Sequence, residues 1–318
     1  MKSQMVRIAR RTCTVLPALL GLVLVANGKQ VLAQSCGCQV SDAKEAEYNQ
    51  LLELDDNQKA DAETVHLPWG VPKTTNPATT ERILYQQDYI IGYDDDVRDP
   101  LWVAYRLTTA DLTSKRKRKD CFRKDPRLSD DAASFCEDYD EPIFDRGHLA
   151  PTADMKRTEA TMINTTILSN ITPQQANFNQ NIWEYLESYA RAIARKKGEL
   201  YIISGSVFDK DGDGAKDDDA VVDRVKPRER VGIPTHFYKI LLYQRSNGFI
   251  ETMTFMLPNT NKKITGHAKS DAYLTDHLAT IDAVETITGI DFFSDLQDNK
   301  ETAVERFNAE ELWSSLPE

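Results

Sequence analysis

The chain is short of positive charge. Its 318 residues hold 39 lysines and arginines against 50 aspartates and glutamates, which gives a formal net charge of −11 at pH 7. The first 33 residues carry five cations and no acids, so the chain without them is more acidic still, at −16. A protein that coats nucleic acid through overall basicity is therefore excluded, and any site for a polyanion must be a local basic patch.

Long apolar runs are absent after residue 33, where no uninterrupted stretch approaches 18 residues, so we expect no membrane span in the mature protein. Residues 1–33 have the order of a secretory signal: a cationic start, an apolar run over 15–26 and small residues before a cleavage point after Ala33. We expect a secreted, extracellular protein. The alternatives are retention as a signal anchor and a lipoprotein site at Cys36.

Cysteine is scarce. Cys13 lies in the predicted signal, which leaves Cys36, Cys38, Cys121 and Cys136. An even number in an exported chain predicts two disulfides, with three possible connectivities. We favour Cys121–Cys136, because it would close a polar loop and stabilise the fold by about 3 kcal/mol. Cys36 and Cys38 would then be available to a partner chain. Zinc binding is the alternative, which the C-x-C spacing disfavours.

Residues 34–65 are acidic and polar with one helical pattern, and we interpret them as a leader segment. Residues 66–318 have the composition of one globular domain. Strands are predicted by β-forming clusters near 89–92, 101–107 and 200–204, and a hairpin by two runs around Asn247-Gly248; helices are predicted over 179–197 and 271–286. This mixed order favours an α+β fold, with a central antiparallel β-sheet flanked by helices.

The segment Phe144-Asp145-Arg146-Gly147-His148 carries the first chemical signal. Arg146 and His148 stand two residues apart at the end of an apolar run, with a glycine between them that allows a backbone turn. A guanidinium can bind a phosphate and an imidazole can accept a proton. The alternative is an ordinary strand end with a surface histidine.

A second signal lies at the start of the helix predicted over 179–197. Asn179 and Glu187 are eight residues apart, about 80° around a regular helix axis, so both can face one side. An amide oxygen and a carboxylate suit a hydrated cation such as Mg²⁺. The alternatives are a helix N-cap for Asn179 and a solvated position for Glu187.

The sequence contains Asp-Arg-Gly-His, Asn170-Ile-Thr-Pro-Gln174, and Asn-x-x-x-Trp with a glutamate eight residues after its asparagine. Together these segments resemble the DNA/RNA non-specific endonucleases, the ββα-metal or His-Me finger nucleases. The resemblance implies a ββα-metal motif and DNA and RNA as substrates. It implies that His148 is the general base and that Arg146 binds phosphate. It also implies that Asn179 ligates Mg²⁺, or Mn²⁺ in its place, that Glu187 holds metal-bound water and that Asn170 orients the site.

The family's upstream arginine does not align cleanly. Arg118, within the basic run 115–119, is the nearest candidate, and Arg123 is the other. Asp145 is expected to fix the local backbone. Asn164 and Asn170 both stand in Asn-x-Thr sequons, and we expect Asn164 to be the glycosylated one if either is modified.

An acidic loop begins at Asp209 with the spacing of the first nine positions of an EF-hand. Its predicted Ca²⁺ ligands are Asp209, Asp211, Asp213, the carbonyl of Ala215, and Asp217. Position 12 is Ala220 in place of glutamate, so Asp218 or Asp219 would have to compensate. The expected role is structural, and a plain acidic loop is the alternative.

Residues 66–293 include the segments Pro100-Leu-Trp-Val-Ala-Tyr, Ser204-Gly-Ser-Val-Phe-Asp and Thr288-Gly-Ile-Asp-Phe. By these and similar segments the region also resembles the nuclease-like domain of ectonucleotide pyrophosphatase/phosphodiesterases, which is regarded as silent because it lacks the motif histidine. Here His148, Asn179 and Glu187 are all present. Two hypotheses follow. One is a secreted, Mg²⁺-dependent endonuclease; the other is a silent, Ca²⁺-binding module that serves protein interaction.

Overall fold

The computed structural model describes residues 37–77 and 79–314. The predicted signal, its alternatives and Cys36 lie outside these residues. None of the helices in the described part combines the length and the apolar character that crossing a membrane requires.

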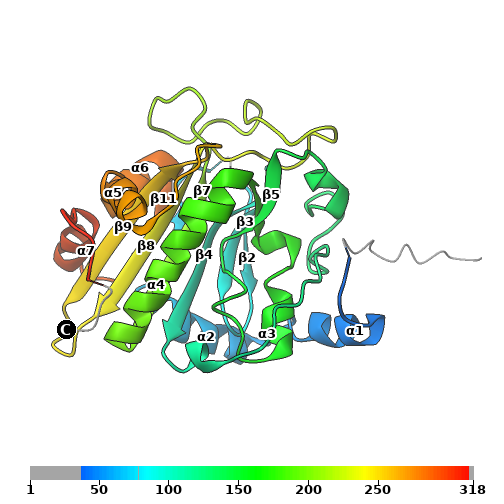
Figure 1. Ribbon diagram of the computed structural model, residues 1–318, viewed down its shortest axis with the longest axis horizontal. Coiled ribbons are helices and arrows are strands. Elements are labelled where there is room, and N and C mark those ends of the chain that lie inside the picture. Colours follow the sequence, from blue (N-terminus) through cyan, green and yellow to red (C-terminus); the bar gives the residue numbers. More distant parts are fainter. Residues whose placement is uncertain (1–36, 78, 315–318) are drawn as a thin grey trace, which may run out of the picture. The chain divides into compact units, whose positions relative to one another are not determined.

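A seven-stranded antiparallel sheet forms the centre of the domain, in the order β10-β9-β8-β7-β4-β3-β2 (Figure 1). Its strands are β2 (Glu81–Tyr85), β3 (Ile90–Asp94), β4 (Asp99–Thr108), β7 (Glu199–Val207), β8 (His236–Gln244), β9 (Ile250–Pro258) and β10 (Leu278–Ala279). The predicted α+β class with a central antiparallel sheet is confirmed.

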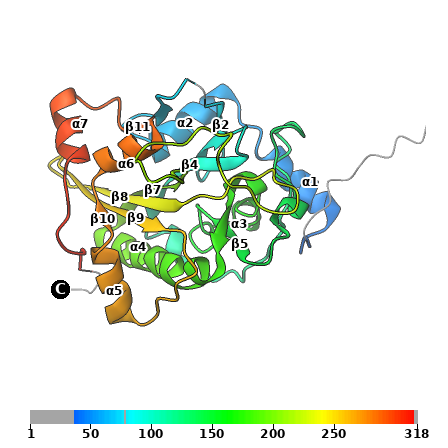
Figure 2. The ribbon, with the colours of Figure 1, turned by 90° about the horizontal axis from the view of Figure 1, so that it is seen from above.

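Both faces of the sheet are covered, as the alternation along β4 shows. Val103 and Tyr105 belong to one buried cluster, and Trp102 and Ala104 to another. Figure 2 shows helices on the two sides. These are α4 (Glu184–Lys197) and α5 (His267–Thr275) on one side, and α2 (Asp56–His66) and α6 (Ile281–Thr288) on the other. The other helices are α1 (Asp42–Gln50), α3 (Glu159–Asn164) and α7 (Asp298–Glu305).

Helix α4 packs on the first face through an apolar stripe that includes Leu186, Ala190 and Ile193. It ends at Gly198, whose φ of 92° favours glycine. On the other face, α2 contributes Ala62 to the core, and α6 contributes Ile281 and Val284. The described part of the predicted leader, 37–65, therefore packs against the domain.

The predicted hairpin is confirmed: β8 and β9 pair along their full length, around a turn in which Gly248 has a φ of 83°. The single helix predicted over 271–286 is wrong. Two helices, α5 and α6, flank β10, because Leu278 and Ala279 pair with β9. The Thr280 hydroxyl then accepts a hydrogen bond from the Ala283 amide and begins α6 anew.

The motif segments form a separate two-stranded hairpin of β5 (Phe144–His148) and β6 (Ile171–Gln175). A π-helical segment, Phe178–Trp183, follows β6 and leads directly into α4. A second small sheet pairs β1 (Lys73–Thr74) with β11 (Ile290–Asp291), and short 3₁₀ helices cover Asp111–Thr113, Cys136–Tyr139 and Leu168–Asn170. Hairpin and helix together form the predicted ββα unit.

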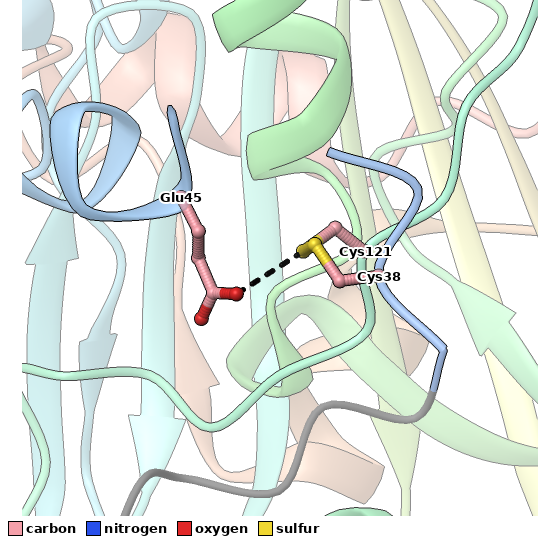
Figure 3. A group of neighbouring side chains, drawn as sticks. All are labelled: Cys38, Glu45 and Cys121. Atoms are coloured by element: carbon pink, nitrogen blue, oxygen red, sulfur yellow. Dashed lines mark hydrogen bonds between the residues drawn. A yellow bond between two sulfur atoms is a disulfide. The ribbon is translucent and has the colours of Figure 1, made fainter. Parts of the chain in front are cut away.

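The predicted Cys121–Cys136 disulfide is wrong. Cys121 is bonded to Cys38 (Figure 3), and Cys136 is engaged in another disulfide. Residues 38–50 lie against the segment before Cys121, where the Gln39 amide donates to the Asp120 carbonyl at 2.8 Å, so Cys38 is the near cysteine. Cys38 is thus used within the chain, and not by a partner. The Cys38–Cys121 bond also consumes two thiolates that zinc would need.

Candidate active site

The β5–β6 hairpin places His148 opposite Ile171 and Arg146 opposite Pro173. Gly147 lies within the strand and does not form the expected turn. Its role is close packing, because a Cβ at this position would lie 2.2 Å from the Gln174 Oε1. The glycine thus lets β6 approach the strand that carries both motif side chains.

His148 is only 9% exposed, and its tautomer follows from its neighbours. The Thr165 hydroxyl donates to the Met162 carbonyl at 2.7 Å, so the Thr152 hydroxyl is the donor in its 2.9 Å contact with Thr165. The Thr152 oxygen then accepts from the His148 Nε2–H, at 3.4 Å. Nδ1 is left unprotonated, with no hydrogen-bond partner in the described part of the chain.

Burial lowers the pKa of His148 to about 3, and the positive charge of Arg118 acts in the same direction. The Trp183 indole donates to the His148 carbonyl at 3.2 Å and fixes the main chain at this point. The imidazole is therefore neutral at physiological pH, which is the form that a general base requires.

Arg146 has no ion-pair partner among residues 37–77 and 79–314. Its buried Nε makes no hydrogen bond, and its guanidinium carbon lies 5.5 Å from the centroid of the Phe122 ring. No carboxylate neutralises this cation, so its charge is available to a phosphate.

Asn179 lies within the π-helical segment, so the N-cap alternative is wrong, and the 80° estimate for a regular helix does not apply. Its Nδ2 donates to the Asp145 Oδ2 at 2.9 Å, and Gln180 donates to the same oxygen at 2.8 Å. Asp145 therefore orients side chains where we had expected it to fix the backbone. The Asn179 Oδ1 accepts no hydrogen bond from the described residues and suits a hard cation.

Glu187 is not a solvated helix residue, because only 12% of its side chain is exposed. Burial raises its pKa to about 7, against the opposing effect of the Lys239 charge. Arg191 lies 3.9 Å from Glu187 and 3.0 Å from Asp154, which also accepts a hydrogen bond from Tyr105 at 2.8 Å.

These partners of Glu187 were missed in the sequence. Asp154 follows His148 by six residues, and Arg191 follows Glu187 by four, the spacing of an ion pair on one helix face. Lys239 is 1% exposed on β8, and burial lowers its pKa to about 8. Its position within a strongly apolar strand was the only available signal.

Asn170 is fully buried. Its Oδ1 accepts from the Ala150 amide at 2.9 Å, and its Nδ2 donates to the carbonyls of Ala150 and Thr165. It thus holds the loop that follows His148. Asn164 is 6% exposed and accepts from Arg123 at 2.7 Å. The expected glycosylation of Asn164 does not fit this burial.

The two candidates for the upstream arginine are now distinguished. Arg123 is 1% exposed, and it donates to Asn49, Asn164 and two backbone carbonyls. The Arg118 side chain is 52% exposed, pairs with Asp120 at 2.7 Å and acts on the pKa of His148. Only Arg118 can therefore present its guanidinium to a substrate.

The acidic loop after β7 gathers three of its predicted ligands. The carboxylates of Asp209, Asp211 and Asp213 lie within 4.8 Å of one another. Gly212 and Gly214, both at positive φ, donate backbone hydrogen bonds to Asp209. Of the remaining predicted ligands, Ala215 and Asp217, the Asp217 Oδ2 accepts a hydrogen bond from the Lys210 amide. Of the two residues that would have to compensate at position 12, Asp218 accepts from the Ala220 amide and Asp219 pairs with Lys216.

The hairpin, the π-helical segment and α4 define a ββα-metal site. A family model described as DNA/RNA non-specific endonuclease matches residues 70–299, and the chain belongs to this family.

Three curated relatives illustrate the similarity. Human mitochondrial endonuclease G is 34% identical over 177 residues, 55% of this chain and 59% of the relative. Nuclease C1 of Cunninghamella echinulata is 31% identical over 70% of this chain and 86% of its own. Bovine ectonucleotide pyrophosphatase/phosphodiesterase family member 3 is 26% identical over 83% of this chain and 32% of its own. The matched region thus spans less than two thirds of endonuclease G.

Proposed function

We propose that the protein is a secreted, Mg²⁺-dependent endonuclease that hydrolyses DNA and RNA with little sequence specificity. The observation that carries the proposal is a neutral, buried His148 on the same hairpin as Arg146, which has no ion-pair partner among the described residues. Asp145 of that hairpin holds the Asn179 amide, whose oxygen accepts no hydrogen bond from the described part of the chain. Family membership and the similarity to named nucleases support it.

His148 takes a proton from water through Nδ1 while the water oxygen forms a bond to phosphorus. The bond between phosphorus and the 3′-oxygen, on the opposite side, breaks; the leaving 3′-oxygen takes a proton from solvent, and the new end carries a 5′-phosphate. Arg146 binds a phosphate oxygen and offsets the charge that develops on it. The exposed Arg118 contacts a neighbouring phosphate of the nucleic-acid substrate. Asn170 keeps the protein loop after His148 in place.

Asn179 and Glu187 carry the amide and carboxylate oxygens that a hard divalent cation takes as ligands. The free Asn179 Oδ1 would ligate Mg²⁺, or Mn²⁺, and Glu187 would hold it through water, as suits a cation that keeps much of its hydration shell. When bound, the cation supplies positive charge beside the phosphate.

Export is supported by the cysteines, because disulfides persist in oxidising compartments. Cys38, Cys121 and Cys136, three of the four cysteines that remain after residue 33, are each disulfide-bonded. The endonuclease G relatives carry the word mitochondrial in their names. Periplasmic or extracellular recovery of the expressed full chain, cleaved after Ala33, is the test of export.

Plasmid nicking tests the activity directly. Purified mature protein should nick supercoiled DNA with Mg²⁺ and not with a chelator, and His148→Ala should abolish most of the nicking. His267→Ala, at an exposed histidine, is the matched control and should retain it. Equal nicking by His148→Ala and the unsubstituted protein would refute the assignment.

The second candidate, a silent Ca²⁺-binding module, is favoured by the loop after β7 and by similarity to the ectonucleotide pyrophosphatase relative over most of the chain. For either function we propose that this loop binds a structural Ca²⁺. Ca²⁺ should raise the Tm of the protein, and Asp211→Ala should remove that rise. A rise in Tm without metal-dependent cleavage would identify the silent module.

A further inference from the structure

Phe122 lies beside two residues of the candidate active site, although no motif includes it. Its ring centroid is 5.6 Å from the His148 ring centroid, with the planes tilted by 55°. The guanidinium carbon of Arg146 lies 5.5 Å from the same Phe122 ring centroid. The half-buried Phe122 packs against a small core cluster that includes Tyr139 and Leu168. One aromatic ring thus contacts both the base and the phosphate-binding cation.

The residue before Phe122 is fixed by the N-terminal segment. Cys121 is fully buried and bonded to Cys38, and its amide donates to the Thr166 hydroxyl at 3.1 Å. Figure 3 shows this disulfide beside Glu45, whose carboxylate lies 3.8 Å from the Cys121 sulfur. The preceding Asp120 exchanges hydrogen bonds with residue 39.

The residue after Phe122 is fixed by the same segment. The Arg123 Nε donates to the Asn49 Oδ1 at 2.8 Å, and the Arg123 carbonyl accepts from the Leu168 amide at 2.9 Å. Phe122 is therefore held on both sides by contacts with residues 38–49. Its own freedom is limited to side-chain rotation against His148 and Arg146.

We propose that Phe122 is a positioning residue for the nuclease reaction and that the Cys38–Cys121 disulfide, with residues 38–49, acts on the active site through it. The inference rests on the proposed function. The ring restricts rotation of the imidazole and keeps the guanidinium beside it through a cation–π contact. Phe122 itself does not touch the reacting atoms, so its effect falls on the alignment of His148 and Arg146.

The first test replaces the ring. Phe122→Leu should lower kcat for DNA about tenfold, which corresponds to about 1.4 kcal/mol of transition-state stabilisation lost when His148 and Arg146 are misaligned. KM should change by less than about twofold, because a loss confined to the transition state leaves ground-state binding unaltered. Phe122→Tyr should restore kcat. Phe249→Leu, at a 58% exposed phenylalanine in the β8–β9 turn, is the matched control and should keep it.

A merely structural role for Phe122 would lower Tm and leave kcat unchanged at temperatures well below the transition. That outcome, or equal losses for Phe122→Leu and Phe249→Leu, would overturn the inference. The proposed function fails separately: it fails if the unsubstituted protein shows no metal-dependent cleavage or if His148→Ala keeps its activity.

The second test asks whether the disulfide acts through the ring. Cys38→Ser/Cys121→Ser should lower kcat, and adding Phe122→Leu should lower it no further than Phe122→Leu alone does, since coupled residues give non-additive effects. Additive losses would show that the disulfide acts independently of Phe122. Should the serine variant fail to fold, Asn49→Ala removes another of the contacts from residues 38–49 and is subject to the same comparison.

Discussion

At the scale of single residues, one carboxylate determines how the proposed metal ligand faces. Asp145 accepts hydrogen bonds from Asn179 and Gln180 through one oxygen, and this turns the Asn179 Oδ1 away from it. The amide is thereby oriented before any cation arrives. Side chains that orient a metal ligand affect metal affinity strongly, although they do not touch the metal themselves.

Asp145→Ala should therefore weaken Mg²⁺ activation by about 10- to 100-fold, because the freed amide loses its fixed orientation. The measurement is the Mg²⁺ concentration that gives half-maximal cleavage. Gln180→Ala removes the second donor to the same carboxylate and leaves Asn179 in place, so it should change that concentration little. Equal effects of the two substitutions would contradict this role of Asp145.

His66, outside the active site, is a second buried histidine whose tautomer is fixed by its neighbours, as that of His148 is. It is 6% exposed, its Nε2 donates to the Gln87 carbonyl at 3.0 Å, and its Nδ1 accepts from the Arg106 amide at 3.1 Å. Burial lowers its pKa to about 4. Protonation would break the contact with Arg106, so the folded protein holds this imidazole neutral.

Because the folded-state pKa of His66 lies below its unfolded value, its contribution to stability is present above about pH 6.5 and is lost as the pH falls towards 4. The loss amounts to about 3 kcal/mol at pH 4. His66→Gln should flatten the dependence of the free energy of unfolding on pH in this range, as measured by urea titrations. A variant curve parallel to that of the unsubstituted protein would refute the assignment.

At the scale of elements, the β5–β6 hairpin depends on the close approach of its two strands. Gly147 allows Gln174 to lie where a Cβ would otherwise be. Gln174 is itself fully buried, and neither of its side-chain polar atoms has a partner in the described part of the chain. Burial of the Gln174 amide without hydrogen bonds is unfavourable, and it accompanies the close strand pairing that holds His148 and Arg146.

Gly147→Ala should destabilise the protein by about 1 to 3 kcal/mol through overpacking and should also lower activity, because the strand that carries His148 must shift. Truncating the opposing side chain tests the cause: Gly147→Ala/Gln174→Ala should be more stable than Gly147→Ala alone. Urea unfolding measures both. A double variant less stable than the single one would show that the clash is not with Gln174.

Regular elements could be predicted from the sequence, and irregular ones could not. The strand 200–204 and the β8–β9 hairpin have apolar patterns that burial alone imposes, so they were confirmed. The π-helical segment 178–183 has the same apolar pattern as an α-helix, and β10 depends on pairing with Phe255 and Thr254 of β9, which lie far from it in the sequence.

Most side chains of the candidate site were found from motif spacing. Phe122, Asp154 and Lys239 were not, because their positions beside His148 and Glu187 arise only from tertiary packing. The disulfide was mispredicted for the same reason. Loop length favoured Cys136, whereas the chain brings residue 38 next to residue 121.

At the scale of the whole molecule, an acidic protein is proposed to bind a polyanion. The basic run 115–119 is exposed from Lys115 to Arg118, and Lys115 and Lys117 have no ion-pair partner in the part of the chain described. Arg118 brings the run close enough to act on His148. A local patch beside the site can therefore attract DNA despite the net charge of −11.

Lys115→Ser/Lys117→Ser should weaken DNA binding and reduce the slope of log affinity against log salt by about 2, since each lost phosphate contact removes about 0.9. Binding of the inactive His148→Ala protein to duplex DNA at several salt concentrations measures this. Lys73→Ser/Lys300→Ser, at two exposed lysines on β1 and α7, is the charge-matched control. The same slope change in both pairs would exclude a specific role for the run.

Anomalous diffraction from crystals soaked in Mn²⁺ tests the central claim most directly. The account predicts a peak at coordination distance from the Asn179 Oδ1, on the side of that amide facing His148, and loss of this peak in Asn179→Ala crystals. Peaks confined to Asp209, Asp211 and Asp213, with none at Asn179, would contradict it.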